Sequence, residues 1–158
     1  MTLVDTHSHI YYDKYEDDLN EVLDRAAESN IEKIICVAVD LKSAEKCLSL
    51  VEKFPNIYMT AGIHPHDAKD APPDFQKELE PYFSHPKTVA VGEIGLDYHY
   101  NFSNSEIQNS VFLAQLELAN SVGLSAVVHC RESEQDILNG IKNTHSQRGV
   151  IHCFSGNL

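Results

Sequence analysis

The sequence predicts an α/β fold of the TIM-type (β/α)8 barrel class, truncated here to about six strands. Three observations carry this prediction. Short apolar runs alternate with amphipathic helical segments along the whole chain. The runs are almost continuously apolar, as in parallel strands that are covered on both faces. Nearly every run also delivers a histidine or a glutamate at its carboxyl end, which favours a barrel mouth over the single switch point of a doubly wound sheet.

The expected strands are runs of strand length that are rich in β-branched and other apolar residues. The first carries the two histidines of "THSH", and the second is the apolar run "IEKIICVAV". The third ends at His64, the fourth contains Glu93, and the last two carry His129 and His152. In chain order these strands cover residues 2–9, 31–39, 57–64, 88–96, 124–130 and 149–156.

The expected helices lie between the strands and repeat apolar residues at helical spacing. Four of them cover residues 15–30, 43–54, 74–83 and 133–143. We expect Pro81 to interrupt the third. Another helix is predicted to begin near Ser103, where Ser103 and Glu106 form a capping box. Its expected core face is Ile107, Val111, Ala114 and Leu118.

The composition is that of an ordinary globular protein, and the net charge restricts the kinds of molecule that it can bind. The 158 residues are 42% hydrophobic and 23% charged, enough for one domain with a core. The formal charge of −12 argues against general electrostatic attachment to nucleic acid or anionic membranes. It leaves open a polyanionic substrate if bound cations reverse the sign locally.

Sequence features also predict a cytoplasmic protein. The four cysteines lie far apart without C-x-x-C spacing, which indicates reduced thiols. No stretch approaches the apolar length needed to span a bilayer, and the start lacks the features of a signal peptide. We therefore expect no membrane attachment.

A metal site is predicted where the strand ends meet. His7 and His9 form an H-x-H pair that projects from one face of a strand. Alone, such a pair is usually a polar strand end exposed to solvent. Imidazole suits zinc and related metals, and a carboxylate can bridge two ions. The convergent set is His7, His9, Glu93, His129 and His152.

Other residues near these strand ends are expected to play supporting roles. Asp5, Asp97 and His66 are expected to cap loops or support the ligands rather than bind metal directly. Cys130 and Cys153 each follow a predicted ligand and should therefore point toward the helix layer as packing residues.

Five ordered motifs resemble those of a known family. The stretches "LVDTHSH", "AGIHPHD", "AVGEIGLDYHY", "VVHCRES" and "GVIHCFSG" are similar to the successive signatures of TatD-type metal-dependent deoxyribonucleases, within the metallo-dependent hydrolase barrels. The resemblance runs through the whole chain. It implies a hydrolase of DNA phosphodiester bonds that trims DNA ends and uses two divalent ions (Zn, Mg or Mn) to activate water.

The resemblance also implies residue roles. His7 and His9 would hold one ion, Glu93 would bridge, and His129 with His152 would hold the second. His64 would face the scissile phosphate, as a catalytic and substrate-binding residue together with the catalytic Glu93. Arg131 would contact a phosphate oxygen.

The chain departs from the family in length. Family members continue past this length and carry a late aspartate that completes the metal site. A closed barrel usually needs about 250 residues. Residues 1–158 are therefore expected to form the N-terminal two-thirds of a single barrel domain. Its open sheet edges are expected to self-associate or bind a complementary piece.

Two other functions compete with a nuclease. One is an amidohydrolase that acts on C–N bonds, since the wider superfamily shares the opening H-x-H. Those relatives commonly place a lysine where Glu93 stands here, which favours phosphate chemistry. The other is an inactive truncated remnant or binding subunit. The most useful measurement is a metal-dependent nuclease assay on this length beside a version extended to a full barrel.

Overall fold

The computed structural model describes residues 1–154 and 156. The strands are β1 (Leu3–Ser8), β2 (Ile31–Val37), β3 (Ile57–Ala61), β4 (Thr88–Asp97), β5 (Ser125–Arg131) and β6 (Gly149–His152). The α-helices are α1 (Leu19–Glu28), α2 (Leu41–Lys53), α3 (Phe75–Phe83), α4 (Ser105–Val122) and α5 (Glu134–Asn143). Two short 3-10 helices, η1 (Asp13–Tyr15) and η2 (Pro65–Asp70), were not predicted from the sequence.

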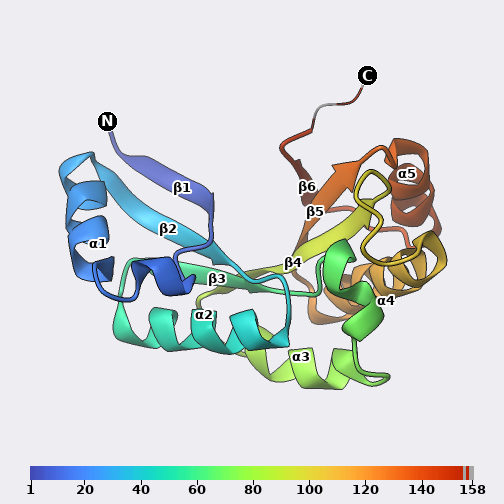
Figure 1. Cartoon of the computed structure of the whole chain (residues 1–158), viewed down its shortest axis with the longest axis horizontal. Coiled ribbons are helices and arrows are strands. Elements are labelled where there is room, and N and C mark those ends of the chain that lie inside the picture. Colours follow the sequence, from blue (N-terminus) through green and yellow to red (C-terminus); the bar gives the residue numbers. More distant parts are fainter. Residues whose placement is uncertain (155, 157–158) are drawn as a thin grey trace.

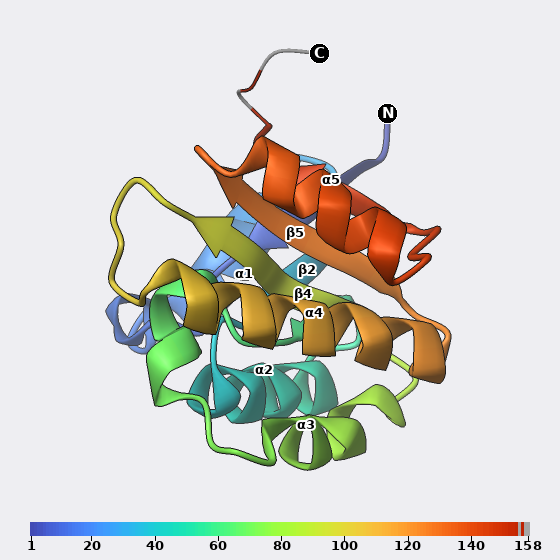
Figure 2. The same cartoon turned by 90° about the vertical axis from the view of Figure 1, so that its right-hand side faces the viewer.

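The strands form one parallel sheet in the order β1-β2-β3-β4-β5-β6. Figure 1 shows this sheet curling into a trough, with β1 along one rim and β6 along the other. Turned by 90°, the same structure shows α2, α3, α4 and α5 lying over the outer side (Figure 2). The predicted fold class is confirmed, because this is a truncated barrel with strands and helices alternating in chain order.

The two rims of the trough meet at one end. The imidazole rings of His7 and His152 stack with centroids 3.5 Å apart and planes 11° apart. Elsewhere the edges are open: Leu3, Val4 and Val150 are 45%, 48% and 55% exposed. Side chains from the first and last strands thus touch at the carboxyl edge of the sheet, while apolar edge residues face outward.

The core lies between the sheet and its helices in two clusters. The first joins β2 and β3 to α2 and includes the fully buried Ile57 and Met59. The second joins β4 and β5 to α4 and α5, and its largest buried side chain is Phe112. These clusters fix the helices against the strands, and the strand ends against one another.

α4 begins near Ser103 as predicted, but its predicted cap was wrong and its predicted buried face was right only in part. Asn104, and not Ser103, caps the helix: its side chain accepts a hydrogen bond of 2.8 Å from the backbone N–H of Ile107. The hydroxyl of Ser103 is instead hydrogen-bonded to η2, where it donates to the His66 carbonyl and accepts from the Lys69 N–H.

The buried side of α4 also differs from the expected one. Ile107 is 37% exposed, although Val111 and Leu118 are buried as expected. Two glutamines lie fully buried on this side instead, and their contacts are described below. The fully or almost fully buried residues of the helix are Gln108, Phe112, Gln115, Leu116 and Ala119.

Two further expectations need correction. Pro81 does not interrupt α3, which continues through it to Phe83. Cys153 lies beyond the end of β6, has a positive φ of 48° and is exposed, so it is no packing residue. Cys130 is buried in the second core cluster, as expected. Part of the predicted 149–156 strand falls on residue 155, outside the described residues.

Candidate metal centre

The carboxyl edge of the sheet surrounds a cavity of about 630 Å³ that contains every site residue predicted from the sequence. The cavity lining consists of His7, His9, His64, Glu93, His129, Cys130, Arg131, His152 and Cys153. Residues from β1, β4, β5 and β6 therefore converge as the barrel interpretation requires.

Glu93 lies at the centre of this cavity. It is only 4% exposed, and its carboxylate faces histidines from three different parts of the chain. Oε2 lies 3.3 Å from Nε2 of His7, while Oε1 lies 3.2 Å from Nδ1 of His129 and 4.0 Å from Nε2 of His64. Burial raises the pKa of Glu93, but hydrogen bonds from His129 and His7 outweigh it and hold the pKa well below its usual range.

The donor atoms fall into two groups that share Glu93. The ligand atoms of His7, His9 and Glu93 lie within 4.8 Å of one another, and so do those of His64, Glu93 and His129. A buried, charged carboxylate between two sets of imidazoles suits divalent transition metals, which imidazole and carboxylate ligands bind together. The residues present therefore fit the metal-dependent chemistry that the sequence motifs imply.

Hydrogen bonds to the far side of each ring determine which nitrogen faces the cavity. Nδ1 of His9 lies 2.8 Å from the Val37 carbonyl, to which it must donate, so Nε2 keeps a free lone pair. Nδ1 of His64 instead accepts the backbone N–H of His66 at 3.2 Å. Burial, the largest cause, lowers the pKa of His64 to about 3, so this neutral ring carries its proton on Nε2. His64 thus presents a donor to the cavity, and His9 presents a ligand.

Asp97 orients two further histidines from the end of β4. Its Oδ2 lies 2.9 Å from Nε2 of His129 and 2.8 Å from Nε2 of His66. Its Oδ1 accepts the backbone N–H groups of His99 and Tyr100. Burial raises the pKa of Asp97, but these hydrogen bonds lower it to about 2. A carboxylate on Nε2 leaves Nδ1 of His129 free to face Glu93, the arrangement of a carboxylate–histidine–metal triad.

The two carboxylates also set the charge preference of His129. Burial lowers the pKa of this imidazole, but Glu93 and Asp97 together raise it on balance. The pair therefore favours positive charge on the ring or beside it. A cation between Nδ1 of His129 and Glu93 would satisfy that preference.

Two glutamines of α4 hold the backbone behind the site, and the sequence prediction missed both. Gln108 accepts from the Asp97 N–H at 2.8 Å and donates to the Asp97 carbonyl at 3.0 Å. Gln115 makes the same pair of hydrogen bonds with Ile63, at 2.7 and 3.0 Å. Their spacing of two helical turns is the signal that could have revealed them. It places two amides on one side of a helix that otherwise faces the core.

The remaining predicted residues lie at the rim of the cavity. His152 stacks on His7 and lies outside both donor groups. Arg131 is exposed, and its guanidinium lies over the ring of Tyr100 at 4.6 Å. Tyr100 and Phe102 border the site, and the sequence analysis did not single them out. Asp5 accepts the backbone N–H of His7, in keeping with a supporting role.

A curled parallel sheet with histidines and a shared buried glutamate at its carboxyl edge defines the chain as part of a metal-dependent hydrolase barrel. The sequence model of one such family, described as TatD related DNase, matches residues 4–158. The chain belongs to this family.

Curated relatives agree with this assignment. The chain is 35% identical over 156 residues to the uncharacterized metal-dependent hydrolase YabD of Bacillus subtilis, a match that covers 98% of this chain and 61% of that protein. It is 34% identical over 146 residues to the 3'-5' ssDNA/RNA exonuclease TatD of Edwardsiella piscicida, covering 90% of this chain and 56% of the relative. The chain thus spans about three-fifths of the length of these relatives.

Solved structures show the same architecture. The TatD homolog YJJV of Escherichia coli superposes with a TM-score of 0.89 at 30% identity, covering 98% of this chain and 61% of the other. A TatD family hydrolase from Entamoeba histolytica superposes with a TM-score of 0.90 at 28% identity, covering 99% and 59%. Among the described residues, no helix is both long and apolar enough to cross a membrane.

Proposed function

We propose that this protein is a two-metal hydrolase that cleaves phosphodiester bonds of DNA and trims DNA ends as an exonuclease. The observation that carries the proposal is the placement of Glu93, buried and charged between His7 on one side and His129 on the other. One carboxylate within reach of histidines from both sides is what a bridging ligand requires. The Edwardsiella relative is named as an exonuclease for ssDNA and RNA, and this supports the substrate class.

In this proposal His7 and His9 hold one divalent ion with Glu93, and His129 with His152 holds a second. When bound, two such ions activate water and stabilise the charge on the reacting phosphate. Zinc, magnesium and manganese are the candidate metals. The tautomer of His9 and the Asp97 contact of His129 support these assignments. His9 keeps a lone pair on Nε2, and Asp97 holds the His129 ring with Nδ1 toward Glu93, where an ion would replace the Nδ1 proton.

His64 and Arg131 bind the phosphate in this proposal. The Nε2–H of His64 faces Glu93 from 4.0 Å, so it can donate to a phosphate oxygen in the cavity. Arg131 lines the same cavity with a permanently charged guanidinium, whose planar donors suit a phosphate. These groups and the ions would attract a substrate that the overall charge of −12 repels.

A divalent-dependent nuclease assay tests the proposal. The 158-residue chain and a version extended to a full barrel are incubated with single-stranded DNA and Mg²⁺, Mn²⁺ or Zn²⁺, with EDTA as the metal-free reference. We expect the extended protein to shorten DNA from its ends only when metal is present. Glu93→Gln should nearly abolish cleavage and reduce the number of metals bound. Glu45→Gln, a change on the exposed side of α2, is the matched control.

Two outcomes would contradict the proposal. One is full cleavage by the Glu93→Gln variant, which would remove the carboxylate from the reaction. The other is hydrolysis of a cyclic amide without any cleavage of DNA, which would replace phosphate chemistry by C–N chemistry.

A further inference from the structure

Two exposed aromatic rings and an arginine lie next to the candidate metal centre. Tyr100 and Phe102 are 49% and 57% exposed, and their rings are parallel within 2° with centroids 5.6 Å apart. The guanidinium of Arg131 lies 4.6 Å from the Tyr100 ring centroid. We call these three residues the aromatic shelf. Large exposed aromatic residues that cluster on a loop next to a polar cavity are typical of a binding surface.

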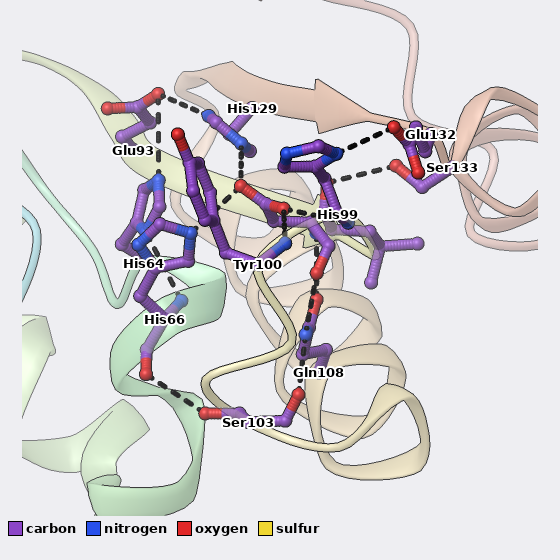
Figure 3. Close-up of polar contacts among 12 residues, drawn as sticks. His64, His66, Glu93, His99, Tyr100, Ser103, Gln108, His129, Glu132 and Ser133 are labelled. Atoms are coloured by element: carbon purple, nitrogen blue, oxygen red, sulfur yellow. Dashed lines mark hydrogen bonds and ion pairs between the residues drawn. The ribbon is translucent and has the colours of Figure 1, made fainter.

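The shelf is continuous with the site through His66. The His66 ring meets Phe102 edge-on at 4.8 Å and Tyr100 at 5.7 Å, and its Nε2 is hydrogen-bonded to Asp97. Figure 3 shows Tyr100 beside His66 in the loop that leaves β4. Arg131 belongs to both places, because it covers Tyr100 and also lines the metal-site cavity.

The loop that carries the shelf is fastened at both ends. At its start the buried Asp97 carboxylate accepts the N–H groups of His99 and Tyr100, at 3.1 and 3.0 Å. At its end lies Ser103, a residue that is only 2% exposed. Its hydroxyl is hydrogen-bonded to the backbone of η2. The rings therefore need little ordering when a ligand arrives, which reduces the entropic cost of binding.

We infer that the aromatic shelf is a base-stacking subsite, which holds an unpaired nucleobase while the adjoining phosphate enters the metal-site cavity. This inference rests on the proposed function and deepens it. Flat rings stack on any base, and a guanidinium stacked on one of them can still donate in its plane to a phosphate. The shelf would therefore favour single-stranded ends, whose bases are free to stack, over duplex ends, and would show little preference among bases.

Base removal separates stacking from phosphate binding. The probe is a single-stranded oligonucleotide with phosphorothioate linkages, which resists cleavage, in the presence of Mg²⁺. A matched set of probes lacks one base at each position near either end. Binding to the 158-residue chain and its variants is measured by fluorescence anisotropy, and folding of each variant is checked by circular dichroism.

We expect Tyr100→Ala and Phe102→Ala each to weaken binding of the intact probe by about 5- to 150-fold, the range that loss of a stacked base gives. Tyr100→Phe should bind like the parent. Removal of one particular base should weaken binding to the parent similarly, but should have little further effect in Tyr100→Ala. Tyr58→Ala is the control, because Tyr58 also pairs with a cation, Lys33 at 5.6 Å, but lies near the amino end of β3.

The possible failures are distinguishable. If Tyr100→Ala weakens the intact and base-free probes equally, or if neither aromatic variant has an effect, the stacking inference is wrong and the proposed nuclease function stands. If the parent and its extended version neither bind nor cleave single-stranded DNA, both fall.

Discussion

His9 and His64 carry the same side chain and line the same cavity, yet the surrounding backbone gives their rings opposite tautomers. The Val37 carbonyl accepts a hydrogen bond from Nδ1–H of His9, whereas Nδ1 of His64 accepts one from the backbone N–H of His66. The first arrangement leaves a lone pair facing the cavity, and the second leaves a proton there. Residue identity alone could not distinguish a metal ligand from a hydrogen-bond donor at these positions.

His64→Ala should therefore reduce turnover without removing metal. Loss of one hydrogen-bond donor to a reacting group lowers turnover by about 10²–10³-fold in other enzymes. We expect a decrease of that order in the extended protein, with metal content close to the parent when measured by mass spectrometry after dialysis. His9→Ala is the contrasting variant and should lose one metal equivalent. Loss of an equivalent in His64→Ala would instead make His64 a ligand.

Asp97→Asn should weaken metal binding at His129 while preserving the fold. Asparagine keeps the size of Asp97 but loses the charge that faces His129 and His66. Replacing such an orienting group typically costs about 10- to 100-fold in metal affinity. Isothermal titration with Mn²⁺ measures the change. Asp136→Asn, which removes the charge beside the Tyr98 hydroxyl, is the control. Equal affinities in all three proteins would mean that His129 needs no orienting carboxylate.

At the scale of elements, α4 hydrogen-bonds to the end of β4 and to the segment that follows β3. Each glutamine amide pairs with both backbone groups of one residue, Ile63 in one case and Asp97 in the other. His64 follows Ile63 directly, and Asp97 carries the orienting carboxylate. The helix thus fixes the backbone from which both site residues project.

Gln115→Leu should destabilise the fold more than an ordinary surface change. It leaves a buried N–H and a buried carbonyl of Ile63 without partners, which costs about 2 to 6 kcal/mol in total. Urea unfolding followed by circular dichroism measures this difference in the free energy of unfolding. Gln135→Leu on the exposed side of α5 should change it by less than about 0.5 kcal/mol. A similar small change for Gln115→Leu would show that the two backbone groups find other partners.

At the scale of the whole molecule, the two rims of the trough are in contact at the carboxyl edge of the sheet and open elsewhere. His7 and His152 touch at the carboxyl edge, while Leu3, Val4 and Val150 are substantially exposed along the rims. Exposed apolar edge strands are sites of association between chains. The relatives are longer, and this chain covers 61% of YabD. The rims are therefore the surfaces on which additional chain or another molecule would pack.

The 158-residue chain should associate with itself in solution, whereas the extended version should be monomeric. It should also bind at least one of its metals weakly and show little nuclease activity, because His152, a proposed ligand, lies outside the donor group of His129 and Glu93. Analytical ultracentrifugation and the DNA assay test both points. A monodisperse monomer of 158 residues that cleaves DNA as fast as the extended protein would contradict this expectation.

Much of the fold and of the candidate site could be predicted from the sequence, because the relevant signals are local. Apolar runs and helical periodicity locate the strands and helices, and parallel connections send every strand end to the same edge. Glu93, His129 and the H-x-H pair therefore meet in one cavity with His152. The family motifs lie at these same strand ends, so the metal-dependent class was also readable from the sequence.

Only the tertiary structure determined the details that depend on residues distant in the sequence. The tautomer of His9 depends on a carbonyl of another strand, and the burial of Gln115 depends on a backbone segment beyond β3. Helical periodicity assigns a glutamine to the surface, because burying an amide is costly unless it has a hydrogen-bond partner. The pattern contains no information about such a partner. The aromatic shelf was missed for the same reason. Tyr100 and Arg131 are distant in the sequence, and only the fold places Arg131 of β5 over the Tyr100 ring.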